Sequence, residues 1–132
     1  MKRLLMTFAL LSVLPLTVGG QTRGGWLRGQ WEGKGFQTDT DSAEPWTMKL
    51  TAGGGRYSVE YPSLDCAGRW RLLSLTRRRA VFSETITRGA ERCAQRGLVV
   101  VERLNPRQLG YWFSQPGSND YTASAILNRQ RR

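Results

Sequence analysis

The feature that most constrains this chain is a series of short stretches in which apolar and polar residues alternate, separated by turns that contain glycine or proline. In the stretch 46–51, for example, Trp46, Met48 and Leu50 alternate with polar residues. Side chains spaced in this way fall on opposite faces of a β-strand. No segment has the periodicity and length of a helix. The predicted strands are 29–37, 46–51, 56–61, 68–75, 80–87, 97–104, 108–113 and 121–127.

Short strands joined by tight turns predict an all-β fold with an antiparallel meander. The clearest hairpin spans 46–61, where three successive glycines at 53–55 turn the chain. A meander of about eight strands can close into a small calycin-like barrel, which removes the exposed strand edges; a β-sandwich is the alternative. Gly33 and Gly35 within the first strand indicate strong bending or a close approach of backbone. The interior of such a barrel either is filled by side chains or holds one small ligand.

The N-terminus has the layout of a secretory signal peptide. Lys2 and Arg3 precede an apolar run from Leu4 to Leu16, and small residues follow up to Gly20. The run is shorter than the roughly 20 residues that a membrane-spanning helix needs, although an uncleaved anchor is the alternative. We therefore expect a signal peptide at 1–20, a linker at 21–28, the barrel domain at 29–128 and a basic tail at 129–132. After cleavage we expect no integral membrane span, and the protein should be periplasmic or secreted.

The cysteine and histidine content bounds the chemistry. Cys66 and Cys93 are the two cysteines, and an even number in an exported chain indicates a disulfide; two reduced thiols are the alternative. The chain has no histidine, which excludes the common Ser-His and Cys-His nucleophiles. Two cysteines alone fall short of a zinc site. We expect no cofactor, no metal and no enzymatic activity.

The charge balance points to anionic partners. The chain has 20 basic and 10 acidic residues and a formal net charge of +10, which favours association with lipid headgroups, acidic envelope polymers or DNA. A GC-rich genome is the alternative source of the many arginines. A plain solvated face is the first interpretation of the arginine cluster, and anion binding is the second, because arginine grips phosphate or carboxylate with two parallel hydrogen bonds. The candidate anion-binding residues are Arg69, Arg71, Arg77, Arg78, Arg79, Arg88 and Arg92, with Arg96 nearby.

Glu84 is the one carboxylate that shares its strand face with apolar residues, namely Phe82 and Ile86. If this face lines the core, the carboxylate needs a cation or hydrogen-bond donors. A structural ion pair with one of the arginines is the first interpretation. A ligand-anchoring carboxylate inside the barrel is the second, and a catalytic acid is the third. The aromatic residues on the strands are expected to pack in the core.

Two resemblances support this fold. Gly29-Gln30-Trp31 resembles the Gly-x-Trp signature that begins the first strand of lipocalins and related calycin barrels. A second pattern is similar to a small uncharacterised domain of exported bacterial proteins, which implies a Cys66–Cys93 disulfide and a β-rich fold but brings no established activity. Its residues are Tyr61-Pro62-Ser63-Leu64, Cys66, Gly68, Trp70, Leu72, Phe82, Glu84, Ile86, Gly89, Cys93 and Tyr111-Trp112.

Together these features predict an exported, non-enzymatic binding or accessory domain. Its partner would be an anionic envelope polymer, a lipid headgroup or a protein, held by the arginine-rich surface. The alternative is a lipocalin-like carrier with a small ligand inside the barrel. An exported inhibitor of an enzyme such as lysozyme is a third hypothesis, which the charge disfavours because lysozymes are usually basic themselves.

Overall fold

A computed structural model shows a closed eight-stranded barrel within residues 23–41 and 43–132, which are the residues that the structure describes. The predicted signal peptide at 1–20 lies outside them. Two short 3₁₀ helices accompany the strands. The elements are η1 (Gly25–Leu27), β1 (Gly29–Gln37), β2 (Trp46–Gly53), β3 (Arg56–Tyr61), η2 (Pro62–Leu64), β4 (Cys66–Leu75), β5 (Arg79–Arg88), β6 (Arg96–Asn105), β7 (Gln108–Ser114) and β8 (Tyr121–Arg129).

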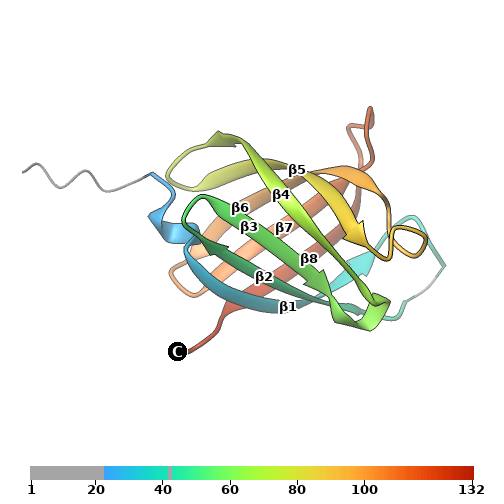
Figure 1. Ribbon diagram of the computed structural model, residues 1–132, viewed down its shortest axis with the longest axis horizontal. Helices are drawn as coiled ribbons and strands as arrows, with labels where there is room; N and C mark the ends of the chain where they lie inside the picture. The colour runs from blue at the N-terminus through green and yellow to red at the C-terminus, as the bar shows by residue number, and fades with distance from the viewer. Residues whose placement is uncertain (1–22, 42) are drawn as a thin grey trace, which may run out of the picture.

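Each strand pairs antiparallel with the next, and β1 pairs with β8 to close the barrel (Figure 1). The all-β meander predicted from the alternating segments is therefore confirmed, and the sandwich alternative is not adopted. Trp46, Met48 and Leu50 of β2 point inward and are buried, as the alternation predicts. Closure leaves no unpaired strand edge in the sheet.

The glycines of β1 let neighbouring strands and side chains come close, as expected. A Cβ atom on Gly33 would lie 2.0 Å from the backbone oxygen of Ile126 in β8, and one on Gly35 would lie 2.3 Å from the Trp46 ring. Real Cβ atoms do not approach other atoms so closely. The seam between the first and last strands therefore requires glycine at 33, and the packing of Trp46 requires it at 35.

One end of the barrel is closed by residues from both ends of the described chain. Leu27 of η1 is buried, and its carbonyl accepts a hydrogen bond of 2.8 Å from Trp31 Nε1. The Arg129 guanidinium lies 4.1 Å from the centre of the Trp31 ring and donates to the carbonyls of Trp26 and Arg28. Part of the segment expected as a linker thus packs against the barrel, and Arg129, expected to begin the tail, is the last residue of β8.

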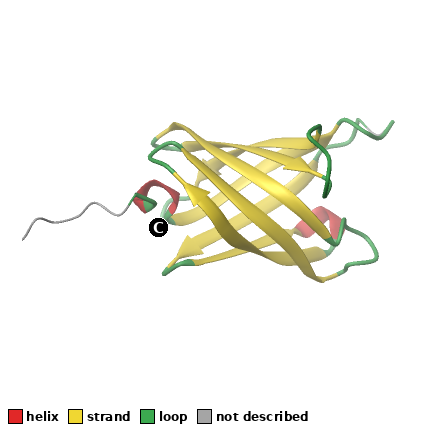
Figure 2. Ribbon diagram, turned by 90° about the horizontal axis from the view of Figure 1, so that it is seen from above, coloured by secondary structure: helices red, strands yellow, loops and turns green. Residues whose placement is uncertain are grey.

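The up-and-down order places alternate connections at opposite ends of the barrel. η1, the turns at 54–55, 76–78 and 106–107 and the residues after β8 lie at what we call the closed end (Figure 2). The loops at 38–45, 62–65, 89–95 and 115–120 lie at the other, open end, where η2 is found. No helix in residues 23–41 and 43–132 is long and apolar enough to cross a bilayer.

Candidate functional site

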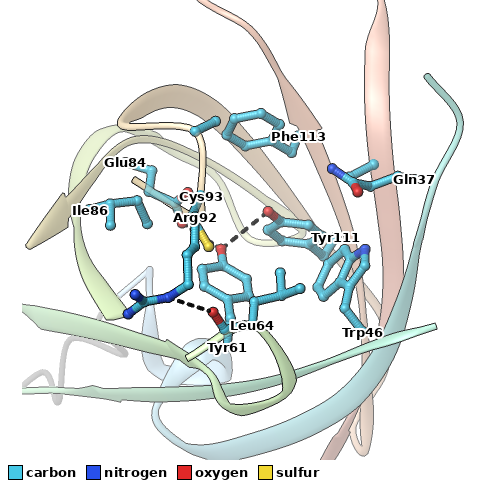
Figure 3. Close-up of a pocket in the computed structure, with 12 residues that line it drawn as sticks. Gln37, Trp46, Tyr61, Leu64, Glu84, Ile86, Arg92, Cys93, Tyr111 and Phe113 are labelled. Atoms are coloured by element: carbon cyan, nitrogen blue, oxygen red, sulfur yellow. Dashed lines mark hydrogen bonds between the residues drawn. The ribbon is translucent and has the colours of Figure 1, made fainter. Parts of the chain in front are cut away.

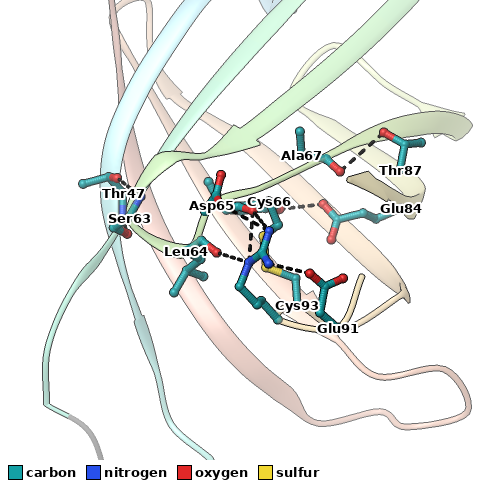
Figure 4. The surroundings of a disulfide bond; sticks show 12 residues. Thr47, Ser63, Leu64, Asp65, Cys66, Ala67, Glu84, Thr87, Glu91 and Cys93 are labelled. Carbon is teal, nitrogen blue, oxygen red and sulfur yellow. Dashed lines mark hydrogen bonds and ion pairs between the residues drawn. A yellow bond between two sulfur atoms is a disulfide. The ribbon is translucent and has the colours of Figure 1, made fainter. Parts of the chain in front are cut away.

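The predicted disulfide between Cys66 and Cys93 is present and shapes the open end (Figure 4). Cys66 begins β4 and is fully buried, whereas Cys93 lies in the loop between β5 and β6. Their Cα atoms are 6.5 Å apart. The bond therefore ties the 89–95 loop to the start of β4, across part of the barrel mouth.

Arg92 reinforces this tie and is not a free anion-binding group. Its Nη2 donates to the Asp65 carbonyl over 2.6 Å and lies 3.3 Å from the Asp65 carboxylate. Its Nη1 pairs with the Glu91 carboxylate, and its Nε bonds the Leu64 carbonyl over 3.3 Å. The sequence predicts Arg92 as a candidate for anion binding, but its donors instead hold the loop against η2.

Glu84 points into the barrel from β5 and is only 4% exposed. Its Oε2 accepts hydrogen bonds from the Tyr61 hydroxyl over 2.5 Å and from Trp70 Nε1 over 2.6 Å. No basic group in the described chain lies within ion-pair distance of this carboxylate. The predicted ion pair with an arginine is therefore wrong. The outward faces of the strands carry the arginines, whereas β3 and β4 supply two neutral donors from the interior.

The Tyr61 hydroxyl is shared between two partners. It lies 3.3 Å from the Tyr111 hydroxyl, and since its one proton is donated to Glu84, Tyr111 must donate to Tyr61. The result is a relay in which Tyr111 donates to Tyr61, and Tyr61 and Trp70 both donate to Glu84. The described hydrogen bonds to the carboxylate all go to Oε2, which leaves Oε1 as its second acceptor.

Burial controls the protonation of these groups. Desolvation raises the pKa of Glu84 from its ordinary value, while the hydrogen bonds from Tyr61 and Trp70 act in the opposite direction. Desolvation also raises the pKa values of Tyr61 and Tyr111 well above the ordinary tyrosine value, and the Glu84 carboxylate adds to both shifts. Both tyrosines therefore remain protonated and act as donors at any physiological pH.

Above the relay, the barrel mouth contains a small cavity of about 130 Å³ (Figure 3). Trp46, Tyr61, Tyr111 and Phe113 form its aromatic walls, and Glu84 contributes to its floor. The Trp46 residue is 6% exposed, yet its Nε1 has no hydrogen-bond partner in the described part of the chain. Deeper in the barrel, closely packed rings fill the interior, such as those of Trp70 and Phe82, whose centroids are 5.1 Å apart and whose planes are tilted by 38°.

The predicted arginines do not form one cluster. Arg69 and Arg71 project outward from β4 in the middle of the wall, and Arg77 and Arg78 lie in the turn at the closed end. Arg79 begins β5 and lies 3.7 Å from Glu102. Arg88 ends β5 near the open end. The candidates are thus spread along the whole length of the β4–β5 hairpin.

A surface groove of about 840 Å³ brings two of them together with Arg96. Strand register explains the arrangement: Thr85 of β5 is paired with Arg69 on one side and with Arg96 of β6 on the other. Two inter-strand spacings put these arginine backbones about 10 Å apart. Hydroxyl groups of Ser83, Thr85 and Thr87 line the floor, and the loop residues 115–118 form one side.

The arginines of this groove have no carboxylate partner. Arg69, Arg71 and Arg96 form none of the ion pairs found among the described residues. Arg71 Nε lies 3.4 Å from Ser83 Oγ, and no other side-chain hydrogen bond occupies the three guanidinium groups in the described chain. We call Arg69, Arg71 and Arg96 with this floor the arginine groove.

Charge is also separated along the barrel axis. The four open-end loops carry six Asp or Glu side chains and one arginine, whereas the closed-end segments carry seven arginines and no Asp or Glu. The acids are Asp39, Asp41, Glu44, Asp65, Glu91 and Asp120, and the arginines of the closed end are Arg23, Arg28, Arg77, Arg78, Arg107, Arg131 and Arg132. A protein with a large positive net charge therefore has an acidic mouth.

Several site residues escaped the sequence reasoning. Four aromatic residues pack in the core, as the sequence predicts, but their polar atoms also serve the site: Tyr61, Trp70 and Tyr111 form the hydrogen bonds around Glu84, and Trp46 carries a donor without a partner in the described chain. The available signal was that their strands place them on the inward face together with Glu84. Strand register, which sequence alone does not supply, decides which of them meet.

Comparison with protein-family models and with curated proteins finds no match for this chain. In residues 23–41 and 43–132, no three Asp, Glu or Cys residues are grouped so that they could hold a metal ion. The barrel mouth and the arginine groove are therefore the two features of the described chain that bear on function.

Proposed function

We propose that this protein is an exported binding domain that holds an anionic polymer in the arginine groove. The observation that carries the proposal is that Arg69 and Arg96 flank Thr85 in a single cross-strand row, in a groove whose arginines have no carboxylate partner among the described residues. A polymer with phosphate or carboxylate groups could be bound at successive sites along this row. The disulfide supports a location outside the cytoplasm, because such bonds persist in oxidising compartments.

The rigid position of these arginines favours the groove over the closed end as the binding site. Arg69, Arg71 and Arg96 are anchored on paired strands, and side chains on strands are held more firmly than those on turns and tails. Because the strands fix the spacing of the three backbones, less backbone entropy is lost when the groove binds a polymer than when a mobile turn or tail does. The hydroxyl floor offers additional donors to the oxygen atoms of the polymer.

The proposal is tested by comparing two triple variants of equal charge. In the groove variant, Arg69, Arg71 and Arg96 are changed to Gln. In the control variant, Arg77, Arg78 and Arg131 at the closed end are changed to Gln. Binding of polyphosphate and of polygalacturonate is measured by fluorescence titration at several salt concentrations, so that phosphate and carboxylate recognition can be told apart.

We expect the affinity of the groove variant to fall about tenfold or more. The slope of its log affinity against log salt concentration should become less negative by roughly 2. The control variant should change the affinity by about twofold to threefold, because it alters only the long-range field. Equal losses in both variants would show that net charge, and not the groove, binds the polymer. Salt-independent binding by the wild type would also contradict the proposal.

The alternative function is a carrier of a ligand within the barrel, and the packing of the interior limits the size of such a ligand. Aromatic side chains fill the deeper interior, and the cavity at the mouth measures about 130 Å³. Pockets for drug-sized ligands are typically about 300–1,000 Å³. A carrier role is therefore confined to a ligand of few atoms at the open end.

A further inference from the structure

The mouth cavity is a polar site within an aromatic shell, separate from the arginine groove in its chemistry. Its volume of about 130 Å³ is close to that of engineered cavities of about 150 Å³ that bind benzene. A molecule of about six or seven non-hydrogen atoms is thus the largest that fits without rearrangement. Leu64 of η2 and Arg92 and Cys93 of the disulfide-bonded loop line one side of the cavity, at the acidic end of the barrel (Figure 3).

Trp46 provides the first sign that the cavity is built for a ligand. Buried N–H groups in folded proteins are almost always hydrogen-bonded, because an unpaired donor loses its water without compensation. Trp46 Nε1 is buried and has no partner within residues 23–41 and 43–132, although Trp31 and Trp70 in the same barrel both have one. A ligand oxygen in the cavity would supply the missing acceptor.

Glu84 provides the second sign, because it is a buried carboxylate whose described partners are all neutral. Buried carboxylates are usually paired with a cation. Here the two donors, Tyr61 and Trp70, both bond Oε2, and Oε1 is available as an acceptor for a cation in the cavity. The guanidinium group of Arg92, which lines the cavity, is turned toward Asp65 and Glu91.

The aromatic walls and the surrounding charges also suit a cation. The Trp46 ring meets Tyr61 and Tyr111 edge to face, with centroids 5.6 and 5.9 Å apart, and such clusters attract ammonium groups to their ring faces. The open-end loops carry six carboxylates against one arginine. An approaching cation therefore meets more acidic than basic side chains on these loops, although the net charge of the chain is positive.

From these four features we infer that the mouth cavity binds a small organic ammonium ion that carries an oxygen atom, such as an amino alcohol. The ammonium group packs against the rings of Tyr61, Tyr111 and Trp46 and faces Glu84. The oxygen accepts a hydrogen bond from Trp46 Nε1. This site is independent of polymer binding, so that either proposal can fail without the other.

The test uses three probes of similar size on the oxidised wild-type protein. Choline has both the ammonium and the hydroxyl, 3,3-dimethylbutan-1-ol has the same shape without the charge, and tetramethylammonium has the charge without the hydroxyl. Binding is followed by tryptophan fluorescence and by two-dimensional NMR. We expect choline to bind saturably. Each of the other two probes should bind with an affinity lower by about tenfold or more.

Two variants locate the interactions. Glu84→Gln keeps an oxygen to accept from Tyr61 and Trp70 but removes the charge, and it should weaken choline about tenfold without affecting the neutral alcohol. Trp46→Phe should abolish the preference for choline over tetramethylammonium. Glu102→Gln, on β6 outside the cavity lining, has the same charge change and should leave choline binding unchanged. Circular dichroism checks that each variant folds.

Several results would overturn the inference. One is an equal affinity for choline and its neutral analogue in the wild-type protein, a comparison that does not depend on any variant folding. Another is an unchanged choline affinity in folded Glu84→Gln. Absence of saturable binding for all three probes at tens of millimolar concentration would show that the cavity holds water only. Loss of choline binding in the arginine-groove variant would show that the two sites are not independent.

Discussion

Removing the Tyr61 hydroxyl tests the interior network most sharply. In Tyr61→Phe, the Glu84 carboxylate keeps Trp70 as a donor but loses its 2.5 Å bond, and the Tyr111 hydroxyl loses its partner. A hydrogen bond to a charged acceptor contributes about 1.5–3 kcal/mol. At the roughly 110 residues of this domain, that loss should lower the melting temperature by roughly 6–15 °C. Tyr57→Phe is the matched control, because Tyr57 is half-buried and its ring packs against Phe82.

The loss should also depend on pH in a defined direction. Burial raises the folded-state pKa of Glu84 above its ordinary value of 4.5, so its contribution to stability is fully present below that value and declines as the pH rises through the raised pKa. The Tyr61 hydrogen bond favours the ionised form, and removing it raises the pKa further. Tyr61→Phe should therefore cost more stability at pH 8 than at pH 4.

Urea denaturation at the two pH values measures this difference directly. For Tyr57→Phe we expect a change within about 0.5 kcal/mol at both pH values. A Tyr61→Phe variant as stable as the wild type would show that the hydroxyl is satisfied elsewhere. An equal loss at pH 4 and pH 8 would show that Glu84 does not change its protonation over this range, and the account of its pKa would then be wrong.

Two further predictions concern the framework. Gly33→Ala should destabilise the barrel by about 1–3 kcal/mol or more because its Cβ meets backbone of β8. Gly53→Ala is the control, since there is open space around it, and it should change the free energy of unfolding in urea by less than about 0.5 kcal/mol. Similar values for the two variants would contradict the close approach of β1 and β8. Replacing Cys66 and Cys93 with Ala should cost about 3.5 kcal/mol, the loop-closure value for 28 residues. A reductant should destabilise the wild type and leave this variant unchanged, and a reductant-insensitive wild type would argue against the disulfide.

The strands and their order could be predicted because both depend on local patterns. Alternation places Trp46, Met48 and Leu50 on one face whatever the rest of the chain does, and tight turns make neighbours in sequence pair in space. The ends of strands were less predictable. β8 continues to Arg129 because ladder pairing with β1 goes on after the apolar pattern has stopped.

The partners of Glu84 show what the sequence could not supply. The Phe82-x-Glu84-x-Ile86 pattern correctly predicted a buried carboxylate, but an arginine was expected beside it. Tyr61 and Trp70 are the actual donors, and they come from two other strands. Their meeting depends on register across β3, β4 and β5, where a shift of one residue would turn each side chain to the other face.

The distribution of charge was in part predictable from the sequence. Arginines close in sequence, such as Arg71 and Arg77, are separated along the hairpin, since each strand residue advances the chain by about 3.3 Å. The separation of acids and arginines between the two barrel ends, however, is contained in the sequence. In a meander, alternate connections fall at the same end of the barrel. Once the fold is known, the sequence of each connection therefore shows that the acidic ones lie at one end and the basic ones at the other.

The most direct test of the proposed function is an NMR titration of the wild-type protein with polyphosphate, following the backbone and the arginine Nε–H signals. The arginine groove predicts that the signals of Arg69, Arg71 and Arg96 shift first and saturate together, along with the backbone of Thr85. Shifts concentrated at Arg77, Arg78, Arg131 and Arg132, with the groove signals unmoved, would contradict the account.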